Sequence, residues 1–149
     1  MKAMLFAALA GLAWGVGEVF TKSVLHSKQV GPITAIAVRS LVALPVLWLA
    51  AWVVLTRTRT EPAGWLGADR AVLAKLVLGS GLIAGAGAML CFYLALSLGE
   101  VSRVKPVAFA LAPATAVLLG WLALGEPMTP RKAAGLACIL AGVLLLTGR

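Results

Sequence analysis

The chain of 149 residues is 62% hydrophobic and only 12% charged, and its mean hydropathy is +1.03. Soluble domains have about 25% charged residues, so this composition excludes an ordinary soluble protein and indicates one whose solvent is the lipid bilayer. The formal net charge of +8 does not indicate a nucleic-acid partner, because the basic residues are dispersed in short connections and form no stripe.

Five apolar runs, joined by short connections, predict an all-α integral membrane bundle of five transmembrane helices. No connection is long enough for a separate extramembrane domain, so residues 1–149 are expected to form a single transmembrane domain. The spans are expected at about residues 3–25, 33–55, 72–98, 104–124 and 132–147.

The first run also has the basic start and apolar stretch of a cleaved signal peptide. It continues past Glu18 to about Leu25, however, which is longer than the apolar core of a typical signal peptide. We therefore expect a retained first helix.

Glu18 is the only acidic residue placed inside a span. Gly11, Gly15, Glu18 and Lys22 are spaced by four, three and four residues and share one helix face. Because small residues let another helix approach closely, this face is expected to point into the bundle. Glu18 then either forms a local ion pair with Lys22, or alternates between a proton and a substrate, since acids inside the membrane often mark transport pathways.

Arg39 lies in the second span, toward the side on which Lys22 also lies. Glu18, Lys22 and Arg39 are therefore expected to converge in one polar pocket, where a guanidinium that keeps its charge can clamp a carboxylate or phosphate. The alternative is that Arg39 extends to lipid headgroups or to backbone carbonyls. Trp14 is expected either to wall the pocket or to pack in the core.

The third run carries Tyr93 and Ser97, one turn apart, as neutral hydrogen-bonding groups on the side of Glu18; Tyr93 is equally suited to anchor at the membrane interface. Its glycines indicate close helix packing or, second, a substrate-lining role; they are Gly79, Gly81, Gly85 and Gly87.

In the fourth run, Pro113 cannot donate a hydrogen bond to the carbonyl of Phe109. The freed carbonyl marks either a packed kink or part of a site.

No set of residues suits metal binding or covalent catalysis. Cys91 and Cys138 lack the spacing of a metal site, and His26 stands alone in a loop. No acid, base and nucleophile occur together, and no phosphate loop or dinucleotide fingerprint is present. We expect neither an enzyme nor a cofactor.

Because the number of spans is odd, the termini are expected on opposite sides of the membrane. The positive-inside rule narrowly favours a cytoplasmic N-terminus, and the near balance leads to the hypothesis that copies insert in both orientations. The basic residues on the N-terminal side are Lys2, Arg57, Arg59, Arg70, Lys75, Arg131 and Lys132, and those on the other side are Lys22, Lys28, Arg103, Lys105 and Arg149.

The order and spacing of several short motifs resemble the EamA domain of the drug/metabolite transporter superfamily, almost from end to end. The motifs are Trp14-Gly15, Phe20-Thr-Lys22, Gly31-Pro-Ile33, Arg39 before Leu41-Val-Ala-Leu44, Phe92-Tyr-Leu-Ala-Leu-Ser-Leu-Gly99, Pro113, Gly125-Glu126, Thr129-Pro-Arg131 and Gly135-Leu-Ala-Cys-Ile-Leu-Ala-Gly142. Glu18 departs from the family pattern, in which an uncharged residue is expected.

The resemblance implies one five-helix half of a transporter fold, since many relatives carry two such halves inverted relative to each other. The spacing of Gly135 and Gly142 is similar to that in the last helix of the small multidrug resistance family, where it serves dimer contact. We therefore expect Gly11, Gly15, Gly135 and Gly142 to pack helices or copies of the chain.

The resulting hypothesis is a secondary transporter, acting as a homodimer that is antiparallel if both orientations form, which moves a small metabolite, amino acid or lipophilic cation by proton-coupled efflux or exchange. The alternative is a non-catalytic half-transporter subunit, or a lipid-carrier flippase component, that needs a second chain. Either would be a multi-pass protein of the cell membrane, expected in a bacterial inner membrane.

Overall fold

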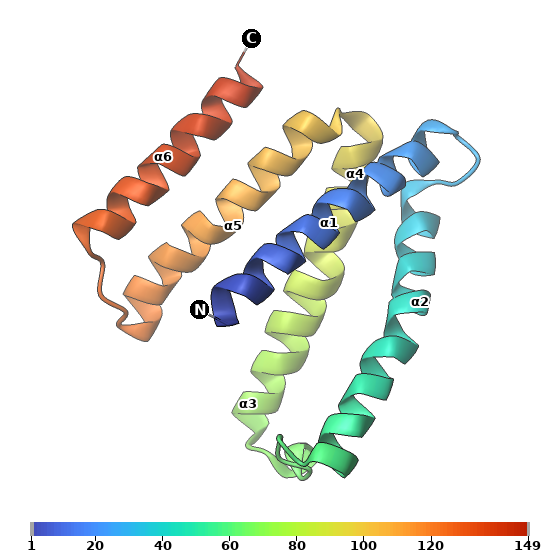
Figure 1. Cartoon of the computed structure of the whole chain (residues 1–149), viewed down its shortest axis with the longest axis vertical. Coiled ribbons are helices and arrows are strands. Elements are labelled where there is room, and N and C mark those ends of the chain that lie inside the picture. Colours follow the sequence, from blue (N-terminus) through green and yellow to red (C-terminus); the bar gives the residue numbers. More distant parts are fainter. Residues whose placement is uncertain (1, 149) are drawn as a thin grey trace. The chain divides into compact units, whose positions relative to one another are not determined.

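The computed structural model describes residues 2–148, so Met1 and Arg149, which enters the charge balance, lie outside the described residues. Within that range the chain is helical and has no strand (Figure 1). Five helical stretches there are long and apolar enough to cross a membrane, which confirms the predicted fold class. They are Lys2–His26, Pro32–Thr58, Arg70–Leu98, Val101–Leu124 and Pro130–Thr147.

The chain divides into two compact units, Met1–Ser97 and Leu98–Arg149. The first unit holds the first three membrane-length stretches. Its elements are α1 (Lys2–His26), α2 (Pro32–Trp52), the π-helix η1 (Val53–Thr58), the 3-10 helix η2 (Trp65–Gly67), α3 (Arg70–Ala74), the π-helix η3 (Lys75–Gly87) and α4 (Ala88–Leu98). The second unit holds α5 (Val101–Leu124) and α6 (Pro130–Thr147).

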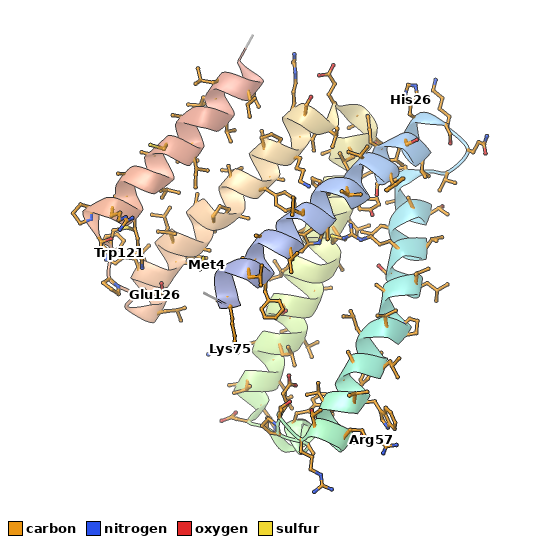
Figure 2. The ribbon with its side chains drawn as sticks, viewed as in Figure 1. Met4, His26, Arg57, Lys75, Trp121 and Glu126 are labelled. Atoms are coloured by element: carbon orange, nitrogen blue, oxygen red, sulfur yellow. The ribbon has the colours of Figure 1, made fainter. Side chains whose placement is uncertain are left out.

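In the first unit, α1 and α2 pack together and are joined by a short loop. The labelled His26 lies at the end of α1, and the labelled Arg57 lies in η1, at the opposite end of the unit (Figure 2). α2 begins with Pro32 directly after Gly31, where the missing proline N–H is no loss because the first helical donors have no intrahelical acceptor. The Arg70–Leu98 stretch begins with a side-chain cap: the Asp69 carboxylate accepts a hydrogen bond from the N–H of Ala71 at 2.8 Å.

In the second unit, α5 and α6 lie side by side (Figure 1). α5 ends at Leu124 and is followed by Gly125, whose φ of 67° is the left-handed conformation that favours glycine. The N–H of Glu126 then donates to the carbonyl of Gly120 at 3.0 Å. α6 begins after Thr129, whose hydroxyl accepts from the N–H of Lys132 at 3.2 Å. These two caps produce the tight reversal between the helices.

The glycines of the third stretch fall in η3, which is closed by the wider i→i+5 hydrogen bonds of a π-helix. A Cβ placed on Gly85 would lie 3.2 Å from the carbonyl oxygen of Ser80, whereas a Cβ on Gly79 would meet nothing within 4 Å. The wide turn therefore depends on glycine at position 85 and not at position 79.

Gly85→Ala is accordingly expected to be less stable than Gly79→Ala by about 1 kcal/mol, because the crowding oxygen belongs to the backbone and cannot rotate away. Gly79→Ala is expected to be neutral or slightly stabilising, since alanine loses less conformational freedom than glycine. Denaturant unfolding of the two variants in the same detergent would measure the difference. Equal midpoints would show that η3 does not need its glycine at position 85.

Candidate functional site

A cavity of about 490 Å³ lies between α1 and α2, and the side chain of Tyr93 on α4 forms part of its wall. Most of its lining is apolar, as in typical small-molecule sites, with a few polar groups among the apolar ones. The lining residues include Trp14, Glu18, Thr21, Arg39 and Tyr93.

Glu18 is buried, with only 3% of its surface exposed. It is the only buried charged residue in the described chain, and it lines the cavity from α1. Its neighbours along the helix, Val16 and Val19, are 59% and 60% exposed, so they are available to lipid. The carboxylate therefore faces protein and the cavity, while the adjacent apolar side chains face outward.

Tyr93 connects three helices through its hydroxyl. Arg39 Nη1 donates to Tyr93 Oη at 3.2 Å, and Tyr93 Oη lies 3.5 Å from Thr21 Oγ1. Thr21 Oγ1 donates its own hydrogen to the carbonyl of Gly17 at 3.1 Å. Arg39 thus donates to Tyr93 and Thr21 donates to Gly17, while either hydroxyl can be the donor in the contact between Tyr93 and Thr21.

Two further features hold this junction in place. Tyr93 is 1% exposed, so its ring is fixed by packing, and the guanidinium carbon of Arg39 lies 5.9 Å from the centre of that ring. Arg39 is half-buried and lines the cavity from α2. Its position is therefore set by protein contacts within the cavity wall.

Lys22 takes a different place from the one that the sequence suggested. Its Nζ donates to the carbonyl of Leu96 at 2.8 Å, and it does not line the cavity that holds Glu18 and Arg39. The last four carbonyls of a helix have no intrahelical donor, and α4 ends at Leu98. Lys22 thus caps the C-terminus of α4, where a cation also suits the helix dipole.

The remaining polar candidates differ in their placement. Ser97 is exposed, and its hydroxyl donates to the carbonyl of Leu94 at 2.7 Å, within its own helix. Pro113 is half-buried in α5, in the second unit, and the helix continues through it to Leu124. Trp14 lines the cavity and is 48% exposed.

The sequence patterns did not identify Thr21 as a candidate site residue, although it lines the cavity and contacts Tyr93. Its position, three residues after Glu18 and four after Gly17, was the available signal. Threonine in a membrane helix usually bonds its own backbone, so spacing alone did not distinguish it from a structural hydroxyl.

The four glycines proposed for packing lie on surfaces of different kinds. Gly15 is half-buried, whereas a Cβ on Gly11, Gly135 or Gly142 would meet nothing within 4 Å. Gly142 is half-buried as well, and the other half-buried positions of α6 recur at spacings of four, three and four residues and form one face; they are Leu136, Leu140, Val143 and Thr147. At 100° per residue, Gly135 and Gly142 lie together on a flank beside that face.

A second hollow, of about 730 Å³, lies at the far end of the first unit and is lined by Trp48 and Trp65. Arg57 stacks near Trp52, with 5.4 Å from the guanidinium carbon to the ring centre. Tryptophan and arginine together are typical of a membrane interface. In the described residues, both cysteines are free and exposed, and no cluster of three acidic, histidine or cysteine side chains suits a metal ion.

One of three comparisons with known proteins finds a match. Neither the curated proteins nor the solved structures contain a match to the chain. The model of the EamA-like transporter family matches residues 1–148, which is nearly the whole sequence, and five described helices are long and apolar enough to span a membrane. The chain is therefore a multi-pass membrane protein that belongs to the EamA-like transporter family, a family of transporters and not of enzymes.

Proposed function

We propose that the protein is a proton-coupled secondary transporter in which Glu18 carries the proton. The observation that supports this role is a carboxylate only 3% exposed on the wall of a cavity of about 490 Å³. The substrate classes that suit such a cavity by size are a small metabolite, an amino acid or a lipophilic cation.

The physical reason is the cost of a charge in the membrane. An ionised carboxylate at mid-membrane costs about 2.5–3.5 kcal/mol even on mild insertion scales. Binding of a proton or a cationic partner to Glu18 removes much of this cost. A group that exchanges such partners on the wall of a cavity can link proton release to substrate movement. Arg39, in the same wall, provides a fixed positive charge.

We further propose that the transporter works as a homodimer. Transporters commonly form a central site between two inverted repeats, and this chain has one five-helix set in its described part. The flank of α6 with Gly135 and Gly142 is open to another helix. The near balance of basic residues favours an antiparallel pair, with both orientations in a cell membrane, and the two compact units would then act together as one domain.

A half-transporter subunit with a different partner chain would use the same glycine flank. It would not need Glu18 to exchange a proton, and this difference separates the two functions.

Glu18→Gln is expected to reduce proton-coupled flux at least tenfold, because an amide of similar shape cannot carry the proton. Purified protein in vesicles with an imposed pH gradient, an internal pH dye and a mixture of candidate metabolites would measure the flux. Glu100→Gln is the matched control: it is the same substitution at an exposed ion pair with Arg103, and such pairs contribute little. Full coupled flux in Glu18→Gln would contradict the proposed role.

A further inference from the structure

We propose that the substrate is an organic anion with one carboxylate and an apolar body, and that Arg39 binds the carboxylate. The inference rests on the proposed transport function and narrows its substrate class. It comes from the different places of the two basic side chains, Arg39 and Lys22, which the sequence alone had put together.

Arg39 is suited to bind a carboxylate. It lines the cavity, keeps its charge in proteins, and has five N–H donors in a planar fork that matches a carboxylate. The bond from Nη1 to Tyr93 Oη uses one of these donors. That bond and the nearby ring of Tyr93, at 5.9 Å, fix the guanidinium before a ligand arrives, which lowers the conformational cost of binding.

The location of Lys22 argues for a single anionic group. Lys22 Nζ donates to the carbonyl of Leu96 at 2.8 Å and does not line this cavity. One guanidinium matches a monoanion, whereas a doubly charged phosphate would be better balanced by two cations. The geometry thus disfavours the basic phosphate site that a lipid-carrier flippase would need here.

A lipophilic cation fits less well. A drug-sized ligand would fill a cavity of about 490 Å³, so its charge would come close to the permanent charge of Arg39, whereas Glu18 in the same wall loses its charge when it carries the proton. The other walls suit an apolar body, since Trp14, Phe20 and Val38 all line the cavity. Their aromatic and aliphatic surfaces would contact the part of the substrate away from its carboxylate.

The chain has one tyrosine, so tyrosine labelled with carbon-13 at Cζ reports on Tyr93 alone by NMR. We would titrate the labelled protein in nanodiscs with benzoate, benzamide and benzyltrimethylammonium, three aromatic probes of different charge. Benzoate is expected to shift the Tyr93 signal saturably and to bind at least tenfold more tightly than the other two. Arg39→Gln is expected to weaken benzoate binding at least tenfold, as for loss of a charge-assisted bond, and to leave benzamide binding within about twofold.

Arg57→Gln is the matched control, because Arg57 is also paired with an aromatic ring, that of Trp52, but does not line this cavity; benzoate should bind it as it binds the native protein. Tighter binding of the ammonium probe, an unmoved Tyr93 signal with benzoate, or unchanged benzoate binding by a folded Arg39→Gln protein would overturn the proposal. The titration uses no pH gradient and no transport. Failure of Glu18→Gln to reduce coupled flux would therefore refute proton coupling and leave the carboxylate result standing.

Discussion

Tyr93→Ala is expected to lower the free energy of unfolding by about 3 kcal/mol or more, as for loss of a buried aromatic side chain. The ring is 1% exposed, and its hydroxyl accepts from Arg39 and contacts Thr21. The substitution therefore opens a cavity and also removes the acceptor of a charged donor. Both losses affect the junction of α1, α2 and α4.

Tyr93→Phe separates the two contributions, because it keeps the ring and removes only the hydroxyl. We expect it to cost about 1–3 kcal/mol, the usual effect of leaving a hydrogen-bonding partner unsatisfied. Phe6→Ala is the control for loss of an aromatic ring, since Phe6 is 69% exposed and should cost less than about 1 kcal/mol in detergent. Thermal and denaturant unfolding followed by circular dichroism would measure all three variants.

The roles of packing and of the hydroxyl could both be refuted by these variants. If Tyr93→Ala unfolded at the same denaturant concentration as Phe6→Ala, the junction would not stabilise the first unit. If Tyr93→Phe matched the native protein, the hydrogen bonds at 3.2 and 3.5 Å would add nothing beyond packing.

The fold could be predicted largely from local properties of the sequence. A membrane helix must satisfy its backbone internally, so apolar runs of sufficient length almost dictate five helices, and caps such as Thr129 with Pro130 mark where a helix begins. The direction of Glu18 also followed from local spacing, because residues three and four apart share a face. Glu18 is buried, whereas Gly11, on the same predicted face, is exposed.

The partner of Lys22 could not be predicted in this way. Its acceptor is the carbonyl of Leu96, 74 residues away, and any of the free carbonyls at helix ends would have been an equally reasonable partner. A backbone acceptor has no residue-type signature. The π-helical winding of η3 could not be predicted either. Its glycines are equally suited to close packing between ordinary α-helices.

The contact between Arg39 and Tyr93 could not be predicted from the sequence. Each had two interpretations, a pocket residue or a residue at the membrane interface, and only the distance between Nη1 and Oη shows that they contact each other. That contact also bears on the surroundings of Glu18. Glu18 shares a cavity wall with a guanidinium that Tyr93 holds in place, and Lys22 also donates to a carbonyl at the end of α4.

Gly135→Leu combined with Gly142→Leu is expected to abolish dimer formation and to reduce transport at least tenfold. Both glycines lie on the flank of α6 beside the face that is half-buried at Leu136, Leu140 and Val143. A Cβ on either glycine would meet nothing within 4 Å, so the leucines should be tolerated by the single chain. They would, however, hold a second helix away from the close contact that small residues permit in membranes.

Ala137→Leu is the matched control, because position 137 lies about 200° from Gly135 around the helix, on the opposite flank. Cysteine-free protein with a single crosslinking site on α6 would measure the dimer in vesicles, and flux would be measured in the same preparation. Monomeric protein with full transport would show that one chain suffices. A crosslinked dimer that survives both leucines would move the contact to another surface, and then the half-buried Gly15 of α1 would be the next position to test.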